Sequence, residues 1–340
     1  MSRIVYYLGA GASVGQRDDT GAIISGLPVV SEIPSEFDLF RDSIARAEIP
    51  EGGAVFQNLY RIDSETARRA QEYMLKDIDS LKDGIREHAT IDTYARKLYL
   101  TGDSQSLEKL KDVLCSFFIW EQLEHKPDNR YDTFLANILE TTTLALPPEI
   151  SLISWNYDSQ IELAYRAYSP RTPLPVFEKN IQYEWPSLPT AGRIFKVNGS
   201  ATFIEGSIIR FILDDNSISK EMQLIQFYSS VRFGDSSWGF KTHLSFAWEK
   251  TKNQDKMMES IVSTVDDTEQ IVVIGYSFPF INRAIDRAFF ASMRRLKKIY
   301  VQDKHCDAVM QSLAAVLPAF TQAQVVPVHD CTQFLLPMEL

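Results

Sequence analysis

Apolar runs that alternate with helical periodicity predict an α/β fold. The runs at 4–8 and 270–274 are apolar at nearly every position, as in strands buried on both faces of a parallel sheet. Further strands are predicted at 150–154, 193–197, 298–301 and 324–328, with 208–213 as another candidate. Apolar residues at three- and four-residue steps predict helices between the later strands, at 282–294 and 305–317. Because strands joined by helices pair in parallel, we expect a parallel sheet with helices on both faces.

One long stretch, from 55 to 145, shows helical periodicity alone. Apolar residues recur at helical spacing within 65–85, 91–100, 107–123 and 131–139. Pro147 and Pro148 end the block, because proline disfavours helix at the preceding residue. We therefore expect a single domain over 1–340 with an all-helical subdomain, 55–145, inserted in it. Asp92 stands where one helix would begin, and we expect it to cap that helix.

Small or polar turns follow four predicted strands. They are Gly9-Ala10-Gly11-Ala12-Ser13, Asn156-Tyr157-Asp158, Asn198-Gly199-Ser200 and Gly275-Tyr276-Ser277. The carboxyl ends of parallel strands share one edge of a sheet, and ligands bind outside that edge. Glycine lets the backbone approach a ligand closely, and a helix starting near Ser13 would point free N–H groups at an anion. The four turns together predict one extended dinucleotide site.

Each turn is assigned to a part of that dinucleotide. The glycine turns would hold the pyrophosphate, with Ser277 and Asn282 at a ribose and Asp303 at the adenosine end. Asn156 and Asp158 would lie near the nicotinamide ribose. A structural alternative is that Asp158 caps its helix and Asn156 bridges backbone groups. A dehydrogenase would instead place an acid about 20 residues after the first glycine turn. Glu32 has that spacing, but prolines flank it and no strand leads to it.

Composition narrows the class of protein. The chain has 340 residues, of which 45% are hydrophobic and 24% charged, as in globular proteins. A net charge of −10 argues against direct nucleic-acid binding. No apolar run approaches the roughly 18 residues that a membrane span needs. The three cysteines and five histidines are scattered, so we expect reduced thiols, a cytoplasmic location and no metal site.

The turns resemble those of the sirtuin-like NAD-consuming proteins. The matching segments are Leu8 to Ser13, Trp155 to Asp158, Lys196 to Ser200, and Ile274 to Ser277 with Asn282. The chain looks most like the bacterial antiphage-defence branch, to which 91–95 and 130–132 are also similar. The helical block replaces the zinc-bearing small domain of sirtuin deacylases. The resemblance implies a Rossmann-like fold with no metal, and NAD as a substrate cleaved to nicotinamide and ADP-ribose.

The resemblance also implies how the enzyme would act and be controlled. Asn156 would position the ribose or a water, and Asp158 would support the cationic transition state. The family usually has a histidine as general base where this chain has Asn198, and asparagine cannot take a proton. Asn198 would then orient water, or His243 would substitute. We expect a regulated homo-oligomer with a separate partner, such as a DNA-translocating ATPase or an Argonaute-type protein. The alternatives are a non-catalytic sensor of NAD or ADP-ribose and, with less support, a protein deacylase.

Overall fold

The protein forms two compact units in a computed structural model that describes residues 3–30, 32–51, 62–88, 90–168, 181–182, 193–204, 218–233, 242–338 and 340. The sheet unit comprises 1–26, 127–199 and 245–340, and the helical unit comprises 27–126 and 200–244. The strand expected at 208–213 lies outside the described residues.

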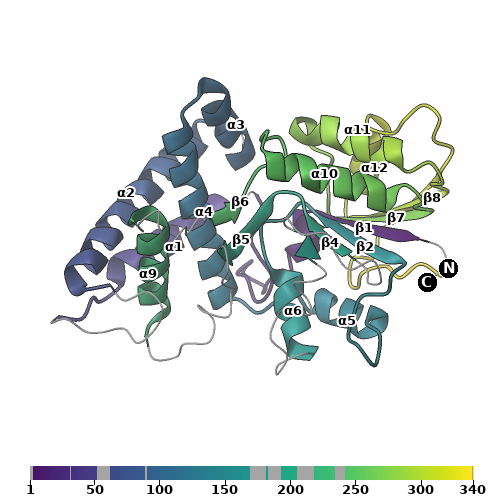
Figure 1. Cartoon of the computed structure of the whole chain (residues 1–340). Coiled ribbons are helices and arrows are strands. Elements are labelled where there is room, and N and C mark those ends of the chain that lie inside the picture. Colours follow the sequence, from purple (N-terminus) through teal and green to yellow (C-terminus); the bar gives the residue numbers. More distant parts are fainter. Residues whose placement is uncertain are drawn as a thin grey trace. The chain divides into compact units, whose positions relative to one another are not determined.

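A parallel sheet forms the centre of the sheet unit (Figure 1). Its strands are β1 (Ile4–Leu8), β2 (Ile150–Ser154), β4 (Arg193–Lys196), β7 (Gln270–Ile274), β8 (Lys298–Gln302) and β9 (Gln324–Val328), with the two-residue β3 (Ile181–Gln182) at one edge. The spatial order is β3-β4-β2-β1-β7-β8-β9, and these strands pair in parallel. Apart from β3, this is the strand order of dinucleotide-binding folds. The expected Rossmann-like parallel sheet is confirmed.

Helices cover both faces of this sheet (Figure 1). They are α5 (Asn129–Ile138), α6 (Gln160–Tyr168), α10 (Lys252–Val265), α11 (Arg283–Ser292) and α12 (Cys306–Ala314). Successive side chains of a strand point to opposite faces. Val5 and Tyr7 of β1 accordingly share a core cluster with α10, α11 and α12. Tyr6, between them, meets Phe134 of α5 edge-on, with ring centroids 4.7 Å apart. This two-sided burial explains why β1 is apolar throughout.

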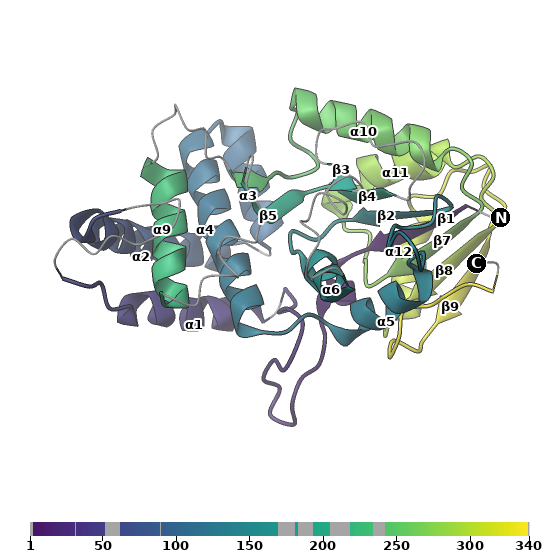
Figure 2. The same cartoon turned by 60° about the horizontal axis from the view of Figure 1, so that its bottom comes forward.

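The helical unit contains α1 (Ile33–Arg46), α2 (Ser64–Arg86), α3 (Ile91–Thr101), α4 (Ser104–Glu124) and α9 (Lys220–Phe233), with a two-stranded sheet of β5 (Gly199–Ile204) and β6 (Thr242–Leu244). Helix α9 packs against α2 and α4 (Figure 2). Side-chain caps start three of the helices: Asp63, Thr90 and Asp103 each accept the backbone N–H of the residue three positions later. Thr90 therefore caps α3, and Asp92, the expected cap, lies in its first turn.

The helical unit does not coincide with the expected insertion at 55–145. Helix α5 lies inside that range but belongs to the sheet unit, where Tyr131 and Phe134 pack edge-on against Phe334 at centroid distances of 5.0 and 5.8 Å. Helix α1 and residues 200–244 instead join the helical unit. Periodicity identified the helices but could not say which unit each one packs against. Among the described residues, no helix is long and apolar enough to cross a membrane.

Candidate functional site

The turns after β1 and β7 meet where the strand order reverses. The Gly9 N–H donates to the carbonyl of Ile274, and the Gly11 N–H donates to the carbonyl of Gly275, both at 3.0 Å. A Cβ atom on Gly11 would lie 2.6 Å from Cα of Gly275, so only glycine permits this approach of two backbones. In open α/β sheets the ligand crevice opens at such a reversal, beyond the carboxyl ends of the strands. The two glycine turns therefore mark the candidate site.

The chain after β1 differs from the expectation of a helix near Ser13. It forms only a four-residue 3-10 turn, η1 (Ala10–Ser13), in which the Ala12 N–H donates to the Gly9 carbonyl at 2.8 Å. An extended loop follows, closed by a hydrogen bond from the Ile24 N–H to the Gln16 carbonyl at 2.9 Å. So short a turn has no helix dipole to speak of. An anion here would be held by individual amides and not by a helix end.

Asn156 is anchored to the glycine turn through its amide nitrogen. Nδ2 donates to the carbonyl of Gly9 at 2.9 Å and to the hydroxyl of Ser13 at 3.2 Å. The side chain is buried, and its Oδ1 makes no hydrogen bond within the described part of the chain. Asn156 thus bonds one backbone carbonyl and one side-chain hydroxyl, where the structural alternative supposed backbone groups alone. It also keeps one acceptor that a hydroxyl or a water can use.

Asp158 caps the next helix with its side chain, and its backbone carbonyl is bonded by a buried lysine. Its Oδ1 accepts the N–H of Gln160, the first residue of α6, at 3.0 Å. Its backbone carbonyl accepts a hydrogen bond from Nζ of Lys196. Lys196 also lies 3.3 Å from Oε1 of Glu162, and both of these side chains are buried. Burial raises the pKa of Glu162, and the charge of Lys196 opposes that rise. This buried ion pair fixes the backbone of the Asn156–Asp158 turn.

Asn198 uses both ends of its amide to join two backbone segments. Nδ2 donates to the carbonyl of Trp155 at 2.8 Å, and Oδ1 accepts the N–H of Ala247 at 2.9 Å. The side chain is only 7% exposed. Orienting a water as well would use the second hydrogen of Nδ2 or the second lone pair of Oδ1. His243, the candidate substitute base, lies in β6 of the helical unit.

Replacing Asn198 with aspartate is expected to lower the free energy of unfolding by about 2 kcal/mol. The carboxylate would keep the bond to the Ala247 N–H but would place a negative oxygen against the carbonyl of Trp155. Urea unfolding at pH 8 measures this. Asn137→Asp is the matched control, because Asn137 is exposed on α5, where its Nδ2 donates to the Thr133 carbonyl. Equal losses in the two variants would contradict the bridging role.

Tyr276, the middle residue of the second glycine turn, has a buried side chain that belongs to a polar network. Its hydroxyl lies 3.2 Å from Oδ2 of Asp286, and Nδ2 of Asn282 donates to the same hydroxyl at 3.2 Å. Burial raises the pKa of Asp286 to about 7, although hydrogen bonds from two tyrosines lower it. Asn282, expected at a ribose, is itself mostly buried, whereas Ser277 is exposed. Of these residues, Ser277 is the one open to a ligand.

The structure connects the four predicted turns and leaves one candidate residue, Asp303, apart from them. Trp155 stacks on Tyr276, with ring centroids 5.1 Å apart and planes 14° from parallel, which links the ends of β2 and β7. Asp303, expected at the adenosine end, follows β8, and its Oδ1 accepts the His305 N–H at 2.7 Å. Among the described residues, Asp303 has no hydrogen bond to the other candidates.

Sequence reasoning missed several residues that support the site. Lys196 and Glu162 form the buried ion pair, Asp286 holds Tyr276, and Asp128 and Arg130 contact the first glycine turn. A signal existed for Lys196, because a charge at the end of an apolar strand needs a partner when it is buried. No such signal existed for Asp286, because an acidic residue in the first turn of a helix is usually exposed.

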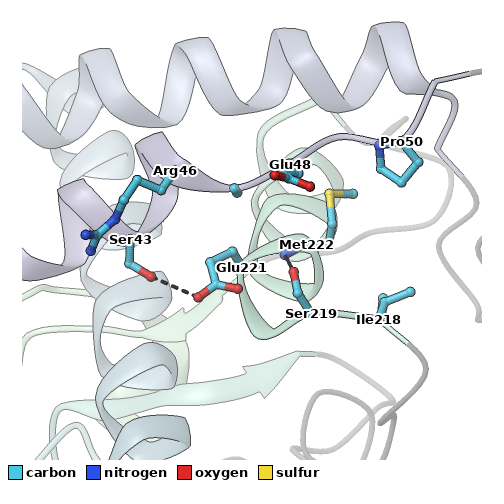
Figure 3. Close-up of a pocket in the computed structure, with 9 residues that line it drawn as sticks. Ser43, Arg46, Glu48, Pro50, Ile218, Ser219, Glu221 and Met222 are labelled. Atoms are coloured by element: carbon cyan, nitrogen blue, oxygen red, sulfur yellow. Dashed lines mark hydrogen bonds between the residues drawn. The ribbon is translucent and has the colours of Figure 1, made fainter.

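Two other features lie in the helical unit. One is a pocket of about 560 Å³, in which the hydroxyl of Ser43 donates to Oε1 of Glu221 at 3.0 Å; Figure 3 draws its lining residues. No residue of the glycine turns lines it. Ligand atoms of Glu36, Glu121 and His125 lie within 4.8 Å of one another, a possible metal-ligand set. Nε2 of His125 lies 3.7 Å from Oε2 of Glu121 within this set, and we assign no metal to it.

The candidate site therefore rests on geometry and on the chemistry of its own residues. Its parts are backbone amides, the Asn156 acceptor, the Asp158 carboxylate and the exposed Ser277 hydroxyl, at the reversal point of a sheet with a Rossmann-like strand order. Among known proteins, no family model matches the chain, and no curated protein matches it at a significant level.

Proposed function

We propose that this protein is a sirtuin-like NAD glycohydrolase. The reaction adds water to C1′ of the nicotinamide ribose and breaks the bond between C1′ and the nicotinamide nitrogen. The products are nicotinamide, ADP-ribose and a proton. The transition state has the character of an oxocarbenium ion, which reacts with water without needing a strong base.

One observation carries the proposal. Asn156 stands at the end of β2, and its amide nitrogen is fixed to Gly9 and Ser13 while its Oδ1 has no hydrogen bond within the described residues. A hydrogen-bond acceptor held this rigidly is suited to orienting a ribose hydroxyl or an attacking water. The neighbouring glycine turns, at the reversal of the sheet, support a dinucleotide as the molecule that brings the ribose there.

The other residues would take supporting roles. The carboxylate of Asp158 would stabilise the positive charge that develops on the ribose ring. Exposed Ser277 would contact the adenosine-side ribose, and amides of the Gly9–Ser13 turn would contact the pyrophosphate. Asn198 would act by holding the Trp155 carbonyl next to Asn156, since both of its amide groups are already bonded. Asn282 and Asp303 would complete the adenosine half.

The biological setting is proposed from the resemblance of the turns. An NAD glycohydrolase that was always active would exhaust its own cell, so the activity needs a trigger. We propose a cytoplasmic effector of bacterial antiphage defence that is switched on by homo-oligomer assembly. A separate partner, such as a DNA-translocating ATPase or an Argonaute-type protein, would sense infection.

Asn198 favours a second candidate function. A residue that cannot accept a proton stands where the resembling family has its base, and its amide is occupied by two backbone bonds. A site of this kind would bind NAD or ADP-ribose without cleaving NAD. The chain would then be a nucleotide sensor or a regulatory subunit.

Purified protein incubated with NAD is expected to release nicotinamide, and Asn156→Ala is expected to lower the rate by about 100-fold. The substitution removes the Oδ1 acceptor that the amide bonds to Gly9 and Ser13 hold in place. Chromatography of the products over time measures the release. Asn137→Ala is the control, because that residue also spends its amide nitrogen on one backbone carbonyl but lies exposed on α5.

The outcomes separate the candidate functions. Release no faster than from Asn156→Ala, in dilute and in assembled protein, would contradict hydrolysis. Tight ADP-ribose binding in that case would support the sensor, and its absence would contradict both. Release that depends on an acylated peptide would indicate a deacylase instead. Circular dichroism of each variant establishes that it is folded.

A further inference from the structure

A single arginine outside the predicted site makes extensive contacts with the first glycine turn. Nη2 of Arg130 donates to the carbonyl of Gly11 at 2.9 Å and lies 3.3 Å from the carbonyl of Ala12. Nη1 donates to the carbonyl of Cys331 at 3.3 Å. The guanidinium therefore binds three backbone carbonyls from two distant parts of the chain. The planar fork of arginine donors makes such a contact possible, and a lysine ammonium cannot reproduce it.

Asp128 holds this guanidinium in place. Its Oδ2 accepts from Nε of Arg130 at 2.9 Å and from Nη2 at 2.5 Å. The same Oδ2 accepts the N–H of Gly15 at 2.9 Å, just beyond the turn. The side chains of Asp128 and Arg130 are 3% and 13% exposed. A buried pair of this kind has fixed geometry, so the turn is held from both of its ends.

The contact sets the direction of the amides as well as that of the carbonyls. In a trans peptide the N–H points opposite to the C=O. With the carbonyls of Gly11 and Ala12 turned toward Arg130, the N–H groups of Ala12 and Ser13 point away from it. The Ala12 N–H is used by Gly9 within the turn, at 2.8 Å. The orientation of the peptide between Ala12 and Ser13 thus depends directly on Arg130.

A second contact from the same helix reaches Asn156. The hydroxyl of Tyr131 lies 3.1 Å from Oγ of Ser13, and both groups are buried. That same Oγ accepts from Nδ2 of Asn156 at 3.2 Å. The start of α5 thereby connects to the turn backbone through Arg130 and to Asn156 through Tyr131.

We propose that Arg130, held by Asp128, is a positioning residue that fixes the backbone of the Gly9–Ser13 turn, on which the pyrophosphate of the substrate would lie. Its effect on catalysis rests on the proposed function. The orientation of the turn itself is a property of the chain alone. A pyrophosphate is bound alike in the ground state and in the transition state, so Arg130 acts on KM and leaves kcat nearly unchanged.

Arg130→Lys tests the proposal, because lysine keeps the charge beside Asp128 but loses the fork. We expect KM for NAD to rise about tenfold with kcat within threefold of the wild type. We also expect amide hydrogen exchange to become at least tenfold faster at residues 9–15 and to stay unchanged in β2 and β7. Arg287→Lys is the matched control, since Arg287 also donates to a backbone carbonyl, that of Ala315, away from the turns.

Unchanged exchange at residues 9–15 in Arg130→Lys would overturn the proposal, and so would a uniform increase across the sheet, which would indicate general loss of stability. A fall in kcat with constant KM would also overturn it. If wild-type protein neither binds ADP-ribose nor cleaves NAD, the proposed function fails. The exchange experiment still decides whether Arg130 orders the turn.

Discussion

Replacing Gly275 with alanine is expected to lower the free energy of unfolding by more than about 4 kcal/mol, a loss that few single substitutions cause. The added Cβ would lie 2.3 Å from Cα of Gly11 and 2.7 Å from N of Ala12. Both are backbone atoms that cannot move aside without breaking the bond from the Gly11 N–H to the Gly275 carbonyl. Gly275 also has φ +58°, in the left-handed region that alanine disfavours.

Gly21 offers a matched control for the conformational part of this loss. It has φ +89°, in the same unit, and a Cβ there would meet nothing within 4 Å. Gly21→Ala should therefore cost only the left-handed conformation, about 1 kcal/mol. Urea unfolding followed by circular dichroism compares the two variants with the wild type. Losses of similar size would mean that the two turns are not packed backbone to backbone.

The sheet was predictable because its strands are buried on both faces. Runs such as 4–8 and 270–274 have no polar face, and only the interior of a parallel sheet accommodates such strands at this length. The alternation of strands and helices then fixed a parallel sheet. The membership of the helices in two units was not predictable. A helical pattern shows which face of a helix is apolar, but it does not indicate which other element packs against that face.

The location of the candidate site could be predicted from the topology of the sheet. The contacts within the site could not. Polar turns after parallel strands had to share one edge, so the proximity of Asn156 to Gly9 and Ser13 could be expected. The prediction for the glycines was correct about the close approach but not about the group that approaches. The sequence predicted a close approach at Gly11, but the structure shows Gly275 as the group that approaches.

Contacts made by side chains from distant helices could not be predicted from the sequence. Arg130 reaches the turn only because α5 packs on the face of the sheet where Tyr6 meets Phe134. Asn198 similarly looked like a candidate for chemistry, but one of its amide bonds goes to Trp155, 43 positions earlier, and the other to Ala247, 49 positions further along. Residues with polar side chains at strand ends serve structure as often as catalysis, and only their partners tell the two apart.

Stability is expected to fall as pH rises from 4 to 8, because of one buried carboxyl group. Asp286 accepts a hydrogen bond of 2.5 Å from the Tyr7 hydroxyl and is fully buried. Burial raises its pKa from 3.8 to about 7. Between these values the folded protein keeps a proton that the unfolded chain has lost. The titration of Asp286 therefore lowers the free energy of unfolding across this range, by roughly 4 kcal/mol.

Asp286→Asn removes this titration while preserving the shape of the side chain. The difference in unfolding free energy between variant and wild type should shift by roughly 4 kcal/mol in favour of the variant from pH 4 to pH 8. Urea titrations at several pH values measure it. Asp307→Asn, at an exposed position of α12, is the control and should show no such shift. Burial also raises the pKa of Asp112 in the helical unit to about 7, which affects both proteins alike.

A difference that stays within about 1 kcal/mol over the whole range would mean that Asp286 is charged in the folded protein, and that the two tyrosine hydroxyls stabilise a carboxylate beneath the second glycine turn.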